Sequence, residues 1–129
     1  MSKPLYLKMG IKEGCKVAVI HPPEDFATFF SNVPFEITWS EDPSEANLVH
    51  FFPKNISNLE EKLFVLQDQI DKEGMIWVSW FKKASKIPTD IDEDIIRDTA
   101  LNLKLVDVKV CSVSDQYSAL KLVIRKHLR

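Results

Sequence analysis

Short apolar runs alternate with amphipathic segments along this chain. Runs that are apolar on both faces lie at residues 15–20, 47–52 and 75–81, and proline, glycine or charged residues bound each of them. Runs of this length without strict alternation are typical of strands in a parallel sheet that is covered on both sides. The segments between them have helical spacing. The pattern therefore predicts strands that alternate with helices, the order of an α/β fold.

Three segments carry apolar residues at helical spacing. Residues 26–30 place three phenylalanines on one face of a short helix. Residues 59–70 form the apolar face of a longer helix, and Ser57 with Glu60 matches the S-x-x-E capping box at its start. The third helix is expected to begin at Thr89 as its N-cap, with acidic residues in the first turn.

The remaining strands decide the topology. Residues 35–39 alternate as an edge strand does, and residues 105–112 and 119–125 are joined by a loop too short for a helical crossover. Right-handed crossovers restrict the winding. We predict one domain over residues 1–129, a three-layer, Rossmann-like α/β fold. Its mostly parallel sheet has strand order 2-1-3-4-6-5, with strand six antiparallel. If the short link after strand two cannot span the sheet, that strand is a frayed edge or pairs differently.

Composition excludes several classes of protein. The chain has 129 residues, 45% of them hydrophobic and 28% charged, and a net charge of −2, which offers no field to attract nucleic acid or an anionic membrane. Cys15 and Cys111 are too few and too isolated for a metal knuckle or a disulfide framework. No apolar run approaches the ~20 residues that a membrane span needs. We expect a cytoplasmic protein with neither nucleic acid nor membrane as partner.

Three motifs flank the predicted strands. They are residues 10–14 (GIKEG), residues 77–85 (WVSWFKKAS) with Thr89 and Asp90 after them, and residues 105–111 (LVDVKVC) followed by residues 118–125 (SALKLVIR). Together they resemble the motifs of a family of small bacterial proteins that is catalogued only as a domain of unknown function. The resemblance covers nearly the whole chain. The resemblance implies that the chain belongs with this family, and because the family has no known activity, it implies no function.

The lead-in at residues 10–14, the strand after it and the C-terminal hairpin are also similar to class I methyltransferases. This resemblance implies a methyltransferase-like form of the fold. Those enzymes carry a glycine-rich loop after the first strand, because glycine lets the backbone approach the cofactor closely. Here residues 21–25 (HPPED) contain no glycine, and Glu41 and Asp42 are only loose counterparts of the acid that holds a ribose. We therefore expect no cofactor, and no binding of S-adenosylmethionine.

The topology indicates where a site would lie. In an open parallel sheet, ligands bind outside the carboxyl ends of the strands where the winding reverses, which here is between strands one and three. Residues 21–25, 50–54 and 80–89 arrive at that edge. From these segments we take the following candidate ligand-binding residues: His21, Glu24, Asp25, His50, Trp80, Lys82, Lys83, Ser85 and Thr89.

Each group of candidates also has a purely structural interpretation. His21 and His50 fit a proton-transfer pair or part of a metal site, or they simply end their strands; no ligand spacing supports a metal, and none is expected. The cationic loop at residues 82–89 fits an anion site beside a helix start, or it is a solvated loop that only caps. Trp80 lines a pocket or packs in the core.

Two functions stay open. The missing glycine loop and the absence of a nucleophile–base constellation favour a non-catalytic module that binds a small anionic ligand or a protein partner at this edge. No serine has the G-x-S-x-G context of a hydrolase. The alternative is a divergent transferase-type enzyme that uses His21, His50 and the lysines. The fold itself supplies no activity, so it does not choose between them.

Overall fold

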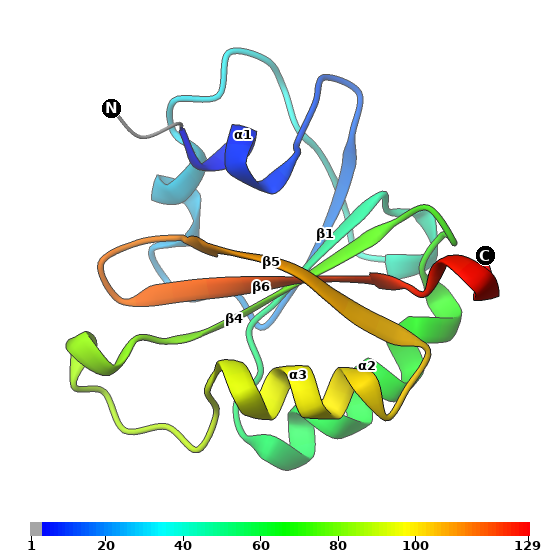
Figure 1. Ribbon diagram of the computed structural model, residues 1–129. Helices are drawn as coiled ribbons and strands as arrows, with labels where there is room; N and C mark the ends of the chain where they lie inside the picture. Colours follow the sequence, from blue (N-terminus) through cyan, green and yellow to red (C-terminus); the bar gives the residue numbers. More distant parts are fainter. Residues whose placement is uncertain (1–3) are drawn as a thin grey trace.

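A six-stranded sheet forms the centre of the computed structural model, which describes residues 4–129 (Figure 1). The strand order is β2-β1-β3-β4-β6-β5, and β6 runs in the direction opposite to the other five strands. This confirms the predicted order and direction. The strands are β1 (Lys16–Ile20), β2 (Thr38–Ser40), β3 (Leu48–Phe51), β4 (Met75–Phe81), β5 (Leu105–Ser112) and β6 (Tyr117–Ile124).

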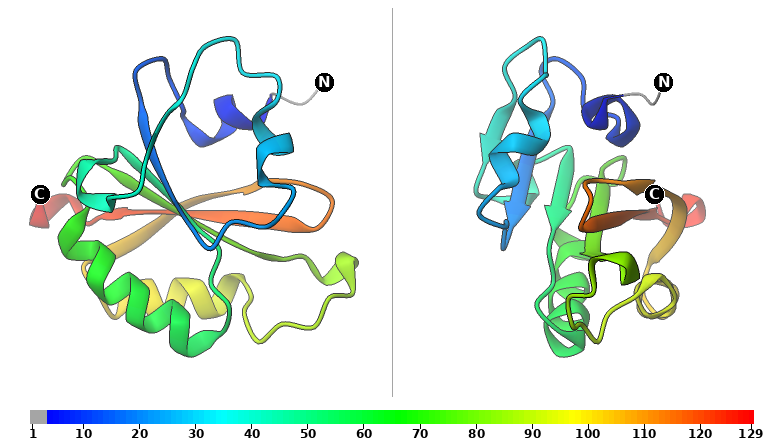
Figure 2. Two further views of the ribbon diagram at one scale, coloured as in Figure 1. Left: turned by 180° about the vertical axis from the view of Figure 1, so that it is seen from behind. Right: turned by 90° about the vertical axis from the view of Figure 1, so that its left-hand side faces the viewer.

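Helical segments cover both faces of the sheet and complete the three layers. One face carries α2 (Ile56–Gln69) and α3 (Glu93–Leu101), while the other carries α1 (Leu5–Met9) and a 3-10 helix, η1 (Phe26–Phe30) (Figures 1 and 2). Short 3-10 turns complete the chain at η2 (Pro43–Glu45), η3 (Lys83–Ser85) and η4 (Lys126–Leu128). Within residues 4–129, no helix is long and apolar enough to cross a membrane.

The link from β2 to β3 is short, yet it crosses β1, because the strands it joins are short. Ser40 at the end of β2 lies level with Ala18 of β1, and Leu48 at the start of β3 lies level with Val17. The chain therefore returns only one residue along the strand direction, while it moves sideways by two strand spacings of about 4.8 Å each. Seven residues, among them η2, span this distance. The edge strand pairs as predicted.

Two apolar clusters lie on the two faces of the sheet. The cluster under α2 and α3 is almost entirely aliphatic, with Leu59, Leu63 and Leu66 of α2 fully buried. The cluster under α1 and η1 is rich in aromatic rings and is centred on Trp77, whose Nε1 donates to the carbonyl of Met9 at 3.1 Å. Successive side chains of a strand point to opposite faces of the sheet, so each strand contributes alternate residues to the two clusters.

The helix starts differ from the sequence prediction. Helix α2 is capped by Asn55, whose side chain accepts a hydrogen bond from the backbone N–H of Asn58, so the capping box at Ser57 was wrong. Helix α3 is capped by Asp92 and not by Thr89, whose hydroxyl instead accepts from the N–H of Ile91. In both cases the observed cap satisfies a free N–H of the first turn, as the predicted one would have done.

Candidate functional site

The carboxyl ends of β1, β3 and β4 arrive at one edge of the sheet. Ile20 pairs with Phe51, and Phe51 pairs with Val78, so β1 and β3 end at the same height, while β4 continues for three more residues to Phe81. A cavity of about 300 Å³ lies at this edge. Its lining residues are His21, Phe52, Pro53, Lys54, Ser79, Trp80, Phe81, Pro88, Thr89, Ile91 and Tyr117. The three strand tips therefore converge around one hollow.

A second, larger cavity of about 750 Å³ adjoins the first and shares Trp80, Phe81, Pro88, Thr89 and Ile91 with it. Its other lining residues include three lysines and four acids, namely Lys82, Lys83, Lys86, Asp90, Asp92, Glu93 and Asp94. The acids already have partners within the fold. Asp90 accepts from the N–H of Ile56, Asp92 caps α3, and Glu93 and Asp94 both bind Arg97.

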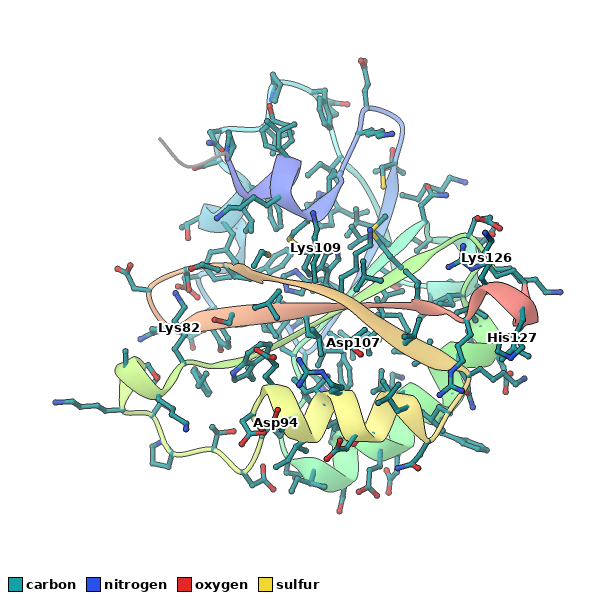
Figure 3. All side chains as sticks on the ribbon, in the orientation of Figure 1. Lys82, Asp94, Asp107, Lys109, Lys126 and His127 are labelled. Carbon is teal, nitrogen blue, oxygen red and sulfur yellow. The ribbon has the colours of Figure 1, made fainter. Side chains whose placement is uncertain are left out.

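The structure separates the predicted site residues into groups. His21, Trp80 and Thr89 line the smaller cavity, and Lys82 and Lys83 line the larger one together with Trp80 and Thr89. Lys82 extends toward the β5–β6 hairpin, where its Nζ lies 2.6 Å from the hydroxyl of Ser112 (Figure 3). The remaining candidates, which line neither cavity, are Glu24, Asp25, His50 and Ser85.

Two of these remaining candidates are occupied elsewhere, and two are solvent-exposed. The Ser85 hydroxyl donates to the carbonyl of Lys82 at 2.6 Å and accepts from the N–H of Ile87, so it stabilises its own turn. His50 is buried in the core. Glu24 and Asp25 are exposed beyond the end of β1. A ligand-binding role for these residues remains a prediction.

His50 forms a buried polar pair with Ser79 on the neighbouring strand. Its Nε2 lies 2.7 Å from the Ser79 hydroxyl, and both residues are only 1% exposed. The ring stacks on Phe52 with centroids 4.3 Å apart and meets Phe26 edge-on. Burial lowers the pKa of His50 to about 3, so the imidazole is neutral at pH 7.

The tautomer of His50 follows from its other nitrogen. Nδ1 is buried and has no hydrogen-bond partner within the described residues. A buried N–H without an acceptor is rarer in proteins than a buried acceptor without a donor, so we assign the proton to Nε2. Nε2–H then donates to Ser79, and the Ser79 hydroxyl keeps its own proton. Ser79 lines the smaller cavity, and its hydroxyl hydrogen has no acceptor among the described residues.

His21 lies at the mouth of the same cavity in a left-handed conformation, with φ of 56°. Partial burial and the positive charge of Lys54 lower the pKa of His21. No hydrogen bond or ring contact joins His21 to His50 in the described part of the chain. The two histidines therefore contact other partners, His50 with Ser79 and His21 with Phe51, and their role as a proton-transfer pair stays a prediction. Across residues 4–129, no group of three or more His, Cys, Asp or Glu side chains is placed to hold a metal ion.

Eight lining residues of the smaller cavity were not among the candidates, and three of them, Ser79, Ile91 and Tyr117, also lie outside the segments that were predicted to reach this edge. Ser79 is the one polar residue inside the apolar run of β4, and that signal was available. Tyr117 reaches the edge for a different reason. It begins β6, and because β6 is antiparallel, the start of this strand arrives where β4 ends, with the Tyr117 ring stacked on Phe81 at 4.6 Å.

The described residues resemble solved structures of methyltransferases. An S-adenosylmethionine-dependent methyltransferase from Aquifex aeolicus matches with a TM-score of 0.59 and 13% identity, over 93% of this chain and 87% of that one. The tRNA methyltransferase TrmK of B. subtilis matches with a TM-score of 0.57 and 10% identity, over 96% of this chain and 66% of that one. Magnesium protoporphyrin IX methyltransferase from Synechocystis, with bound S-adenosylmethionine, matches with a TM-score of 0.53 and 9% identity. The match covers 85% of this chain and 69% of that one.

At these identities the likeness shows the fold alone, and it confirms the methyltransferase-like architecture. No family model matches the chain, and no curated protein sequence does either. The resemblance to the small bacterial family therefore stays a prediction. Since the structural neighbours are methyltransferases that depend on S-adenosylmethionine, that compound must be weighed as a possible cofactor of this chain.

The residues after β1 lack the glycine-rich loop that class I methyltransferases carry at this position. No glycine follows the strand, and Phe26 lines a cavity of about 570 Å³ together with Val19 of β1. The Phe26 ring lies 5.6 Å from Trp39 of β2, 5.7 Å from His50 of β3 and 5.9 Å from Phe52, measured between ring centroids. Trp39, Ser40 and Glu41 at the end of β2 line this same cavity. The expected absence of S-adenosylmethionine binding therefore stays a prediction that rests on the missing glycine-rich loop.

Proposed function

We propose that this chain is a non-catalytic module that binds a small anionic ligand in the cavity at the strand ends. One observation carries the proposal: the smaller cavity contains five polar lining residues, and none of its lining residues is acidic. The polar residues are His21, Lys54, Ser79, Thr89 and Tyr117. A cavity of about 300 Å³ suits a small molecule, since ligand sites begin at about this volume.

The polar groups of the cavity are mostly donors. Lys54 forms no ion pair within the described residues, and Ser79 has a hydroxyl hydrogen left over from its pairing with His50. Trp80 and Phe81 add flat apolar surface beside them. Such a site favours a ligand that carries a carboxylate or phosphate at one end and an apolar body at the other.

The same geometry supports binding over catalysis. Ser79 is the one serine that lines the smaller cavity, and its histidine neighbour is a hydrogen-bond donor with a pKa of about 3. A general base needs a pKa near the working pH and a third group to orient it. His50 has neither, because its Nδ1 meets no partner in the described residues. The fold likeness alone favours the alternative, a divergent transferase.

Thermal-shift and calorimetric titrations test the proposal with inorganic phosphate, a nucleoside monophosphate, a sugar phosphate, citrate and S-adenosylmethionine. A ligand that binds only the folded chain raises the melting temperature. We expect an anionic compound to do so, with affinity reduced at least tenfold in Lys54→Ala and in Ser79→Ala. Lys72→Ala, which changes an exposed lysine far from the cavity, serves as the matched control and should leave affinity unchanged.

Two results would reject the proposal. Stabilisation by S-adenosylmethionine that is lost on Asp25→Ala would favour the transferase, because it would place the cofactor beside the segment after β1. A wild-type chain whose melting temperature responds to none of the anionic compounds would reject the anion site itself.

A further inference from the structure

A groove runs between α2 and α3 on the side that faces away from the sheet. Its volume is about 940 Å³, and it shares no lining residue with the two cavities at the strand ends. The lining residues are Ile56, Glu60, Glu61, Phe64, Val65, Ile95, Asp98, Thr99, Asn102 and Leu103. This groove is therefore a separate surface from the proposed ligand site.

The floor and one wall of the groove are apolar and open to solvent. Phe64 is 61% exposed and Val65 is 45% exposed, although both lie in the middle of α2. Ile56 and Phe64 belong to one ridge of α2, because residues four apart lie on the same side of a helix. Ile95 supplies the facing ridge on α3. Exposed apolar side chains that gather around a hollow, with polar residues at its rim, mark an interaction surface.

The charges around the groove have one sign. Glu60, Glu61 and Asp98 are the charged residues that line it, and none of the three forms an ion pair in the described part of the chain. Lys62, which follows Glu61 on α2, does not line the groove, and two further cations nearby are engaged elsewhere. Arg97 forms ion pairs with three acids. Glu93 and Asp94 lie on α3, as Arg97 does, and Asp107 lies on β5 (Figure 3).

Lys104, the cation that follows α3, is engaged in the same way, because its Nζ lies 2.9 Å from a carboxylate oxygen of Asp68. Neither Lys104 nor Arg97 lines the groove. The acids of the rim therefore remain available to an outside cation, and the groove combines an apolar floor with a negative rim.

We propose that this groove binds a basic amphipathic helix of a partner protein. A third helix fits between two neighbouring helices by laying its apolar side chains between their ridges. Lysines or arginines that flank its apolar stripe would then lie beside Glu60, Glu61 and Asp98. A second copy of this chain is a poor occupant, since a two-fold interface would bring the two acidic rims together, and like charges across an interface oppose association.

Two synthetic helical peptides of about 18 residues provide the probe, a length at which an isolated helix begins to form. Both carry leucines at i, i+3, i+4 and i+7 spacing; one has lysines and the other glutamates at the flanking positions. Calorimetry with the full chain should show binding of the lysine peptide that weakens as salt is added, because the Debye length shrinks. The glutamate peptide should bind at least tenfold more weakly.

Variants locate the binding in the groove. Phe64→Ser should weaken the lysine peptide about tenfold or more, because an aromatic anchor at the centre of an interface carries much of the binding energy. The triple variant Glu60→Lys, Glu61→Lys and Asp98→Lys should no longer bind the lysine peptide and should bind the glutamate peptide instead. Its matched control is Glu36→Lys, Glu41→Lys and Glu45→Lys, which changes the net charge equally through exposed residues elsewhere. The control should keep the lysine peptide.

Three results would overturn the proposal. One is equal binding of both peptides, or no binding of the lysine peptide. Another is an affinity that Phe64→Ser leaves unchanged. The third is a concentration-dependent dimer, seen by sedimentation, that Phe64→Ser dissociates, because it would assign the groove to a second copy. Phe64 is exposed, so Phe64→Ser should fold, and circular dichroism verifies this.

Discussion

The two faces of the sheet are packed by different means. On one face, α2 and α3 are regular helices whose aliphatic side chains fill the space above the strands. On the other, α1 and η1 span only five residues each, and aromatic rings fill the space instead. Phe26 alone has five ring neighbours. The comparison indicates that large side chains can cover a sheet where the helices are too short to do so.

The aromatic face has a further consequence. Rings pack with offset and edge-on geometries that leave room for a polar group of similar shape. His50 uses that room, stacked on Phe52 and bonded to Ser79. On the aliphatic face, the buried polar exception is Gln67, which accepts from the backbone N–H of Lys104 and so ties α2 to the loop after α3. The candidate ligand cavity adjoins the aromatic face.

The largest expected effect compares one buried residue on each face. Trp77→Ala should reduce the free energy of unfolding by about 3–5 kcal/mol and Leu63→Ala by about 2–5 kcal/mol, because each leaves a cavity in a packed core. Urea unfolding measures both. Trp77→Phe keeps most of the ring but leaves the Met9 carbonyl without its donor, and it should cost about 1–3 kcal/mol. A loss below about 1 kcal/mol for Trp77→Ala would show that the aromatic face contributes little to stability.

A medium effect depends on pH and belongs to the aromatic face alone. Burial lowers the pKa of His50 from 6.5 to about 3. At pH 7 the residue is neutral in the folded chain and mostly neutral in the unfolded chain. As the pH falls below 6.5, the unfolded chain binds a proton that the folded chain does not, so stability decreases until the pH approaches 3.

Between pH 7 and pH 5, this difference should reduce the free energy of unfolding by about 2 kcal/mol. His50→Gln removes the titrating group, so its stability should decline less over this interval by about that amount. Urea unfolding of both chains at the two pH values measures the slopes, and a lower stability of the variant at pH 7 does not affect the comparison. Equal slopes would mean that His50 titrates in the folded chain with the same pKa as in the unfolded chain.

The smallest expected effect concerns the helix starts. Asn55 caps α2 through a 2.8 Å hydrogen bond from the N–H of Asn58, and Asn55→Ala should cost about 1 kcal/mol. On the opposite face, Asp25 stands at the start of η1 but its side chain makes no capping bond. Asp25→Ala should therefore change stability by less than about 0.5 kcal/mol, as at an ordinary surface position. A similar loss for both would show that η1 depends on its first residue after all.

Much of the fold could be predicted because it depends on periodicity and chain length. Apolar runs identified β1, β3 and β4, and the short loop between β5 and β6 required an antiparallel hairpin. Helix starts were harder, since Ser57 and Thr89 were both plausible caps, and the choice of Asn55 and Asp92 depends on where the chain leaves the preceding strand. The candidate site was predicted only in part, because reasoning from parallel strands alone overlooked the start of β6.

By itself, the sequence determined which segments are strands, their order in the sheet and the edge at which the strand tips meet, since these follow from local pattern and the handedness of crossovers. The tertiary structure decided what that edge presents. It buried His50 against Ser79, turned Ser85 into its own loop, left Glu24 and Asp25 in solvent and brought Tyr117 to the cavity. These outcomes depend on which side chains from distant segments share one space, and no single segment contains that information.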